Sequence, residues 1–202
     1  MARVLIVDDN EEVCRCIKAV LEDAGHVVHS AQAVEAGIAA LRGSAEPRPY
    51  EVALIDLRFE NFGETDADKA RAGMKVVEAA LKVPFLEPIM LTAYPSHATA
   101  AEALAQGIFR YLTKSGESAS ALEGAPGFME TLVNAVQLAV DNRTVMKTLA
   151  ECLAEARRCF QSIESEISNK ALVDEVWNCI TTAEKAHSII LRARGRNPAS
   201  SS

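Results

Sequence analysis

The sequence of 202 residues is poor in aromatic side chains and contains no long apolar run. Phe, Trp and Tyr together make up only 5% of it, so its core must be mostly aliphatic. No apolar run reaches the ~20 residues that a membrane-spanning helix needs, and acids at Asp8 and Asp9 come too early for a secretory signal peptide. The five cysteines are an odd number with no secretory context, which favours reduced thiols. We therefore expect a cytoplasmic protein with no membrane contact.

Excess acidic charge is confined to the first part of the chain. Residues 1–123 contain 12 Lys and Arg against 19 Asp and Glu, whereas residues 124–202 contain nine of each. The net charge of −7 argues against non-specific binding to nucleic acids or anionic membranes. Gly and Pro are absent from residues 128–194, so this stretch contains no helix breaker. We therefore expect two parts, residues 1–123 and residues 124–202, with any cation chemistry in the first.

Short apolar strands alternate five times with helices in the first part. The pattern predicts strands at 3–7, 26–30, 51–57, 88–92 and 108–112, and helices at 11–24, 34–41, 74–81 and 98–106. This alternation predicts an α/β fold with a doubly wound, five-stranded parallel sheet covered by helices on both faces. In such sheets ligands bind beyond the carboxyl ends of the strands.

Charged and hydroxyl side chains stand where the predicted strands end. Asp8 and Asp9 follow the first strand, Asp56 ends the third, Thr92 ends the fourth, and Lys114 follows the fifth. Three carboxylates that meet in one crevice repel each other unless a cation lies between them, and hard oxygen ligands suit Mg²⁺. One carboxylate could then attack a phosphoryl group, whose charged oxygens the lysine and the hydroxyl would contact.

These motifs resemble those of the receiver domain of two-component response regulators. The similarity lies in the order and strand-end placement of VDDN at 7–10, LIDLR at 54–58, MLTAY at 90–94 and AQGIFRYLTK at 105–114. The resemblance implies a flavodoxin-like fold for roughly residues 1–116. It also implies a histidine kinase or a phosphotransfer protein as the phosphoryl donor, and a receiver that catalyses its own phosphorylation and dephosphorylation.

The resemblance also implies an acceptor and a metal site. Asp56 would be the phospho-acceptor. Mg²⁺ would be bound by the carboxylates of Asp8, Asp9 and Asp56 and by the backbone carbonyl of Arg58.

Three further residues receive roles from the same resemblance. Thr92 and Lys114 would contact the phosphoryl group. Tyr111 would be the aromatic residue that rotates inward as Thr92 moves, so that Thr92 and Tyr111 form the switch.

The chain departs from the family pattern beside the expected site. Gly73, which would begin the helix after the acceptor strand, lies 17 residues after Asp56 instead of roughly eight, so the segment between Phe59 and Ala72 contains an insertion. This segment is either a mobile surface loop or a lid or kinase-specificity element. A second insertion, at 115–127, delays the start of the next helix to Phe128.

An apolar heptad pattern runs through the breaker-free second part. Its members are positions 128, 132, 135, 139, 142, 146, 149, 153, 156, 160, 163 and 167. We expect the closing helix to extend beyond the first part and to form a helical hairpin or coiled-coil extension, with a turn near 168–170; one continuous helix is the alternative. Because two helices have a thin core, we expect a homodimer through residues 140–194 that forms a four-helix bundle.

The second part offers no DNA-binding module and no catalytic output motif. It is neutral and has no basic recognition helix. The leading hypothesis is therefore a response regulator that signals through protein–protein contacts with an unknown downstream partner. Alternatives are a phosphorelay intermediate or phosphate sink, and a scaffold with a vestigial receiver. A phosphotransfer role for His187 is less favoured, because His187 lies on the apolar stripe.

Overall fold

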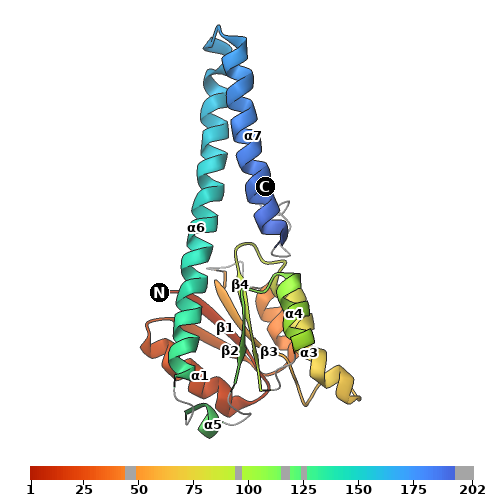
Figure 1. Ribbon diagram of the computed structural model, residues 1–202. Coiled ribbons are helices and arrows are strands. Elements are labelled where there is room, and N and C mark those ends of the chain that lie inside the picture. Colours follow the sequence, from red (N-terminus) through yellow and green to blue (C-terminus); the bar gives the residue numbers. More distant parts are fainter. Residues whose placement is uncertain (44–48, 94–96, 115–118, 124–126, 194–202) are drawn as a thin grey trace.

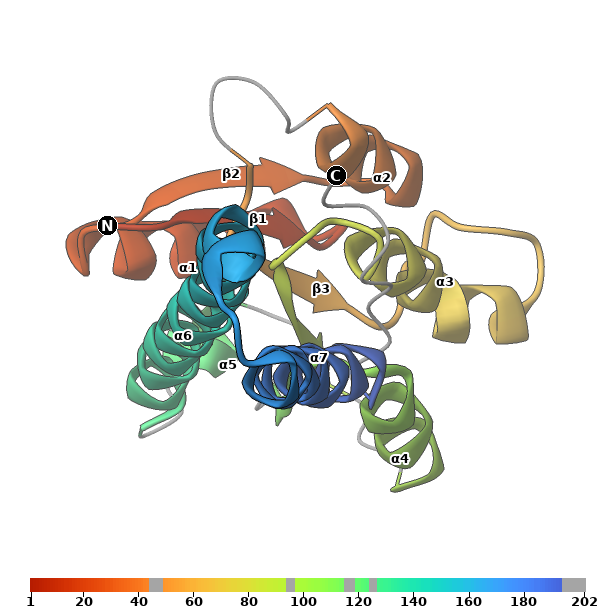
Figure 2. The ribbon, with the colours of Figure 1, turned by 90° about the horizontal axis from the view of Figure 1, so that it is seen from above.

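The computed structural model describes residues 1–43, 49–93, 97–114, 119–123 and 127–193, and its centre is a five-stranded parallel sheet (Figures 1 and 2). The strands are β1 (Arg3–Val7), β2 (Val27–Ala31), β3 (Val52–Asp56), β4 (Glu87–Thr92) and β5 (Arg110–Thr113). They lie in the order β2-β1-β3-β4-β5, and every neighbouring pair is parallel. The predicted doubly wound sheet is confirmed.

Helices cover both faces of the sheet. The described helices are α1 (Glu11–Asp23), α2 (Val34–Arg42), α3 (Asp66–Ala80), α4 (His97–Gln106), α5 (Ala119–Glu123), α6 (Phe128–Ile163) and α7 (Lys170–Ala193). One face packs a core cluster with α2, α3 and Ala103 of α4, and the other packs a cluster with α1, α6 and Leu122 of α5. We refer to the sheet and the helical turns packed on it as the α/β body.

Helix α3 begins eight residues earlier than the sequence pattern predicts. Thr65 caps its first turn in a capping box, because the Thr65 hydroxyl accepts from the Asp68 N–H while the Asp68 carboxylate accepts from the Thr65 N–H. The expectation of a surface loop between Phe59 and Ala72 is therefore wrong for Asp66 onward, where the insertion lengthens a helix.

The segment after β3 is fastened to the middle of α3. The Gly73 N–H donates to the Leu57 carbonyl at 2.9 Å, and the Phe59 N–H donates to the Lys69 carbonyl at 3.0 Å. A Cβ atom on Gly73 would lie 1.9 Å from the carbonyl oxygen of Asp56. Only glycine therefore lets α3 approach the carboxyl end of β3 this closely.

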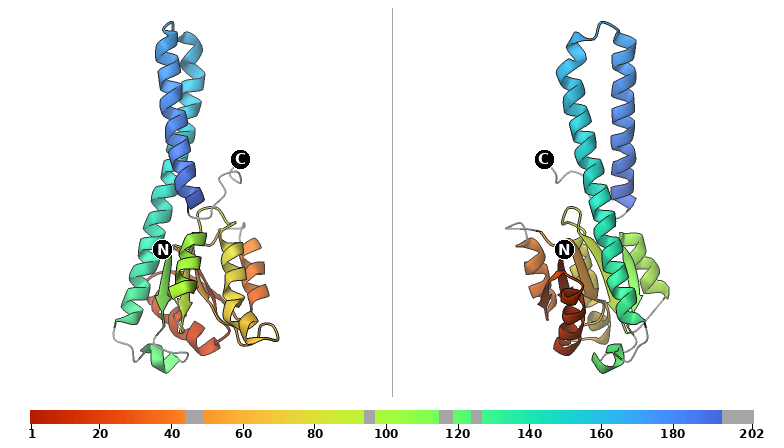
Figure 3. Two further views of the ribbon diagram at one scale, coloured as in Figure 1. Left: turned by 45° about the vertical axis from the view of Figure 1, so that its right-hand side comes forward. Right: turned by 90° about the vertical axis from the view of Figure 1, so that its left-hand side faces the viewer.

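Helix α6 begins in the core of the body and leaves it at the amino ends of the central strands (Figures 1 and 3). Its first turns bury Phe128, Leu132, Ala135, Val136 and Ala139. Two polar contacts then mark its exit from the body. Asn142 Nδ2 donates to Glu87 Oε1 at 2.6 Å, and Arg143 Nη1 lies 2.9 Å from Glu51 Oε1. Glu51 immediately precedes β3 and Glu87 begins β4, so the exit is at the edge of the sheet opposite to Asp56.

Beyond this exit, α6 and α7 form the expected hairpin. A 3₁₀ turn at Glu164–Glu166 and residues 167–169 connect α6 to α7. The connection overlaps the predicted turn near 168–170 and begins a few residues before it, and the alternative of one continuous helix is wrong. Phe160 and Trp177 meet edge to face with ring centroids 5.1 Å apart, and Arg157 Nε donates to Glu184 Oε1 at 2.7 Å. None of the helices in the described ranges is both long and apolar enough to span a bilayer.

Only half of the predicted heptad pattern faces inward in the hairpin. Met146 and Phe160 are buried and Leu153 is half-buried. The alternate members Leu149, Ala156 and Ile163 are exposed. The less exposed positions of α6 in the hairpin are 146, 150, 153, 157, 160 and 164. Three of them contact α7 directly: Arg157 binds Glu184, Phe160 packs on Trp177, and Glu164 accepts a hydrogen bond from the Trp177 indole. The pattern predicted an apolar stripe correctly but placed its buried edge about one residue too far towards the amino terminus.

Because α3 and β3 approach closely at Gly73, we expect one added methyl group there to lower the stability of the fold strongly. We expect Gly73→Ala to lower the free energy of unfolding by about 2–3 kcal/mol, because the helix and the strand end must move apart. Gly43→Ala is the control, since a Cβ there would meet nothing closer than the Ala39 carbonyl at 3.4 Å. Urea unfolding followed by circular dichroism measures both; equal midpoints for the two variants would contradict the packing argument.

Candidate functional site

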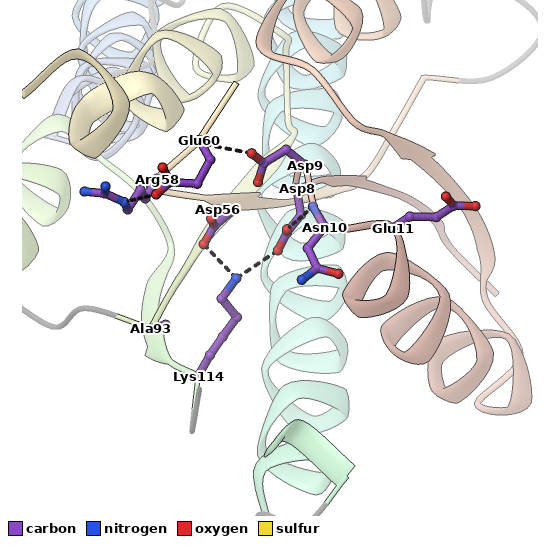
Figure 4. A pocket seen from close by; sticks show the side chains of 9 residues that line it. All are labelled: Asp8, Asp9, Asn10, Glu11, Asp56, Arg58, Glu60, Ala93 and Lys114. Atoms are coloured by element: carbon purple, nitrogen blue, oxygen red, sulfur yellow. Dashed lines mark hydrogen bonds and ion pairs between the residues drawn. The ribbon is translucent and has the colours of Figure 1, made fainter. Parts of the chain in front are cut away.

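The carboxyl ends of β1 and β3 and the end of β5 bring two acids to one lysine. Asp8 and Asp56 are 1% and 6% exposed, and Lys114, directly after β5, is 5% exposed. Lys114 Nζ lies 2.9 Å from Asp8 Oδ2 and 2.9 Å from Asp56 Oδ1, so its ammonium group bridges the two carboxylates (Figure 4). The sequence prediction that these three side chains meet is confirmed.

The loop after β1 is fixed by hydrogen bonds to its own acids. Asp8 Oδ1 accepts from the Asn10 N–H at 3.0 Å, and the Asn10 side chain caps α1 by accepting from two N–H groups of its first turn. Asp9 Oδ2 accepts from the Glu60 N–H at 2.7 Å. Asp9 therefore joins the β1 loop to the segment after β3 across the mouth of the site.

Asp8, Asp9 and Asp56 together offer a ligand set for a divalent cation. One carboxylate oxygen from each of Asp8, Asp9 and Asp56 can be chosen so that all three lie within 4.8 Å of one another. They line an open cavity of about 390 Å³, to which Lys114 contributes the nearest cation. Three carboxylates and one ammonium leave two uncompensated negative charges when all are ionised. A small, hard cation that accepts oxygen ligands and keeps some of its waters, such as Mg²⁺, fits this set.

Burial and charge set the protonation of the acceptor candidate. The pKa of Asp56 is raised to about 7. Burial is the largest cause of the rise, the Lys114 ammonium acts against it, and the neighbouring Asp8 carboxylate adds to it. Burial alone would lower the pKa of Lys114, but the charges of Asp56 and Asp8 outweigh it and the pKa is raised. Lys114 therefore stays charged, and a cation at the cluster would favour the ionised form of Asp56.

The side chain of Arg58 points away from Asp8 and Asp56 (Figure 4). It forms ion pairs with Glu60 and with Asp66, the latter at 2.7 Å between Nη2 and Oδ1. Glu60 also lines the cavity, which the sequence patterns do not predict. No motif marked it, because it lies inside the insertion. It reaches the site only because the segment after β3 is held against α3.

Thr92 and Tyr111 lie on the two neighbouring strands β4 and β5. Thr92 ends β4 and is buried, and its carbonyl accepts from the Lys114 N–H at 2.7 Å. Tyr111 is half-buried and packs on the core cluster of α3 and α4. Its buried hydroxyl has no hydrogen-bond partner among the described residues. Residues 94–96 and 115–118, which follow these strand ends, lie outside the described part.

The fold and this strand-end cluster together define a flavodoxin-like α/β domain of the receiver class. A family model, the response regulator receiver domain, matches residues 4–123. The chain belongs to this family.

Curated relatives match the same part of the chain. It is 32% identical over 116 residues to the photosynthetic apparatus regulatory protein RegA of Cereibacter sphaeroides, covering 57% of this chain and 56% of RegA. It is also 32% identical over 115 residues to the acid tolerance regulatory protein ActR of Rhizobium meliloti, covering 57% of this chain and 53% of ActR. The chain thus matches only about half the length of these relatives.

Solved structures agree with the fold. A CheY-like response regulator receiver domain from Methanospirillum hungatei is similar with a TM-score of 0.55 and 23% identity, covering 71% of this chain and 97% of that one. NtrX from Brucella abortus is similar with a TM-score of 0.58 and 18% identity, covering 75% of this chain and 29% of that one.

The raised pKa of Asp56 predicts a pH-dependent stability in the absence of metal. Because the folded-state pKa is about 7 and the unfolded value is 3.8, stability is greatest below the unfolded value and falls as pH rises through 7. In EDTA we expect wild type to lose about 2 kcal/mol between pH 5 and pH 8, and Asp56→Asn to lose much less. Urea titrations across this range measure both.

The matched control is the exposed acid Asp66. Its pKa is lowered by the hydrogen bond and the charge of Arg58, so it does not titrate between pH 5 and pH 8. Asp66→Asn should keep the wild-type slope. A wild-type slope that persists in Asp56→Asn would show that another group causes it.

Proposed function

We propose that this protein is a phosphoryl-accepting response regulator, with Asp56 as acceptor, Mg²⁺ as cofactor, and a histidine kinase or phosphotransfer protein as donor. The observation that carries the proposal is the contact of the Asp56 and Asp8 carboxylates with the same buried Lys114 ammonium, beside an open acidic cavity. Removing the charged groups of Asp8, Asp56 and Lys114 from water costs free energy. A receiver that no longer accepts phosphoryl groups would gain nothing that offsets this cost, so the buried charges favour a working site.

The proposed step is an in-line displacement at phosphorus. A carboxylate oxygen of Asp56 forms the new P–O bond while the P–N bond to the donor imidazole breaks, and the departing nitrogen keeps the electron pair and takes up a proton. Lys114 and the Thr92 hydroxyl would contact the phosphoryl oxygens. Mg²⁺ held by Asp8, Asp9, Asp56 and the Arg58 carbonyl would neutralise part of their charge. Attack by water on the same phosphorus would return the carboxylate and release phosphate.

Phosphorylation should depend on both the acceptor and the metal. With acetyl phosphate and Mg²⁺ we expect the full chain to gain the mass of one phosphoryl group, and Asp56→Asn and EDTA-treated protein to gain none. Asp141→Asn, which removes an exposed acid of α6, should label like wild type. Intact-protein mass spectrometry reads all four samples. Undiminished labelling of Asp56→Asn would refute the assignment.

We further propose that the second part of the chain, residues 124–202, acts as the signalling output, and that its hairpin forms a homodimer. On α6 the exposed positions Val145, Leu149, Cys152, Ala156, Cys159 and Ile163 form a stripe, each one residue before a position that faces α7. On α7 the mostly exposed positions Leu172, Val176, Cys179, Ala183 and Ala186 precede its inward positions in the same way, and the exposed Ile190 continues their spacing. Because the helices are antiparallel, equal offsets place both stripes on one side of the hairpin. We call this side the apolar face.

The other side of the hairpin is polar, which supports a single partner on the apolar face. Lys147, Arg158, Gln161, Asp174 and Lys185 lie there, all exposed. A second copy is the occupant proposed, because two apolar faces packed together would complete a four-helix bundle through residues 140–194. The small residues in the middle of both stripes would allow the two hairpins to approach closely.

Lysine substitutions at two exposed alanines of α6 test whether the apolar face forms the dimer or whether any added charge disrupts it. We expect Ala156→Lys, on the apolar face, to shift the protein to monomer, and Ala154→Lys, on the polar side, to leave the dimer intact. Both sites are exposed in the monomer, so neither change should unfold it. Light scattering at micromolar concentration, with and without beryllofluoride, measures the outcome. A wild-type monomer under both conditions would refute the homodimer.

The burial of His187 in the hairpin argues against a phosphorelay through this residue. His187 is 9% exposed, which is a poor position for a histidine that exchanges phosphoryl groups with a partner. This favours an output by protein–protein contact over a relay through the hairpin. A phosphate sink would instead show rapid loss of the Asp56 label without any change in assembly or partner binding.

A further inference from the structure

A second and larger cavity lies at the opposite end of the receiver from Asp56. Its volume is about 770 Å³, within the range of small-molecule sites. Its walls come from α2, from the second half of α3, from residues 82–85 before β4, and from α6 just beyond its exit from the body. The cavity therefore lies between the receiver and the part of α6 around Arg143 and Lys147, which we call the stem of the hairpin. The phosphorylation chemistry proposed above makes no use of it.

Part of the lining of this cavity is apolar, and we call this part the floor. Ile38, Leu41, Ala79, Val83 and Phe85 line it. Phe85 has a φ of +55°, the left-handed region that a bulky side chain rarely adopts, and no other described non-glycine residue has positive φ. The strained turn at Phe85 contributes its side chain to the cavity wall, and strain of this kind is concentrated at ligand sites.

The lining is strongly cationic in a chain whose net charge is −7. Five of its residues are basic and one, Glu78, is acidic; the basic residues are Arg42, Lys75, Lys82, Arg143 and Lys147. Three of them already have a partner. Arg143 pairs with Glu51 at 2.9 Å, Lys147 pairs loosely with Glu151 at 3.7 Å, and Lys75 lies over the Phe62 ring.

Two basic side chains and one guanidinium nitrogen of this lining have no partner within the described residues. Arg42 and Lys82 have no ion pair there, and both are exposed. The buried Nε of Arg143 has no hydrogen-bond partner in the same part of the chain. A buried guanidinium N–H without an acceptor is unfavourable, and an anionic group in the cavity could supply that acceptor.

We propose that this cavity binds a small amphipathic anion, in which an aliphatic or aromatic body carries a carboxylate, sulfonate or phosphate group. The body would cover the apolar floor, and the anionic group would lie among Arg42, Lys82 and Arg143. The chain's own last segment, 194–202, fits poorly because its side chains include two arginines and no acid. A bound anion would contact α2 and α3 of the receiver and α6 of the stem, and would hold them together.

The probe is 8-anilinonaphthalene-1-sulfonate, an aromatic anion whose fluorescence rises in apolar surroundings. We expect saturable binding to the full chain, displaced by decanoate and not by decanol. Arg42→Ser/Lys82→Ser should weaken binding at least about fivefold, since two cations leave the rim. Ala79→Trp, which places an indole over the floor, should abolish the saturable phase.

The matched control is Lys170→Ser/Lys185→Ser, which removes two exposed cations from the hairpin and should bind like wild type. Circular dichroism and the Asp56 labelling assay show whether each variant is folded, so loss of binding is separable from loss of structure or of phosphorylation. Absence of saturable binding to wild type, equal displacement by decanol, or binding that survives in Ala79→Trp would overturn the proposal.

Discussion

The docking of α6 on the sheet is the contact on which the rest of the structure depends. One helix closes the core beneath β1, β3 and β4 with its first turns and supplies half of the hairpin with its last. Its direction is fixed where Asn142 meets Glu87 and Arg143 meets Glu51. Because these contacts lie at the amino ends of β3 and β4, the acidic site and the hairpin are held at opposite ends of the receiver.

The acidic site depends on a different balance, between burial and charge. Asp8 and Asp56 are withdrawn from water, which disfavours their ionised forms, and Lys114 restores part of that loss. The arrangement leaves residual negative charge at an open cavity, so it is poised to take up positive charge. The same balance explains why Gly73 matters: if α3 could not approach the end of β3, the segment carrying Arg58 and Glu60 would not close beside Asp9.

The positions of residues that follow a periodic pattern can be predicted from the sequence. The positions of residues held by a contact with one particular distant residue cannot. The five strands and the meeting of Asp8, Asp56 and Lys114 follow from apolar periodicity and strand-end position. Apolar periodicity does not predict the first eight residues of α3, most of which lie in the insertion, although Thr65 and Asp68 form a capping box there. The apolar pattern misplaces the buried side of α6 by about one residue, because the Arg157–Glu184 pair and the hydrogen bond from the Trp177 indole to Glu164 are polar contacts with no periodic signal.

The geometry limits how a change at Asp56 can reach the hairpin. Thr92 is joined to Lys114 of the site by a backbone hydrogen bond. Among the described residues, the hairpin continues from the body through α6, of which residues 128–143 are docked and about 20 residues project beyond. At 1.5 Å per residue the free part is ~30 Å long, so a small tilt of the docked turns would be magnified at the tip. A bundle of two hairpins would resist such tilts unless both receivers moved together. Pairing of the apolar faces would therefore couple the two acceptor sites, and a ligand between α3 and α6 would act on the same joint.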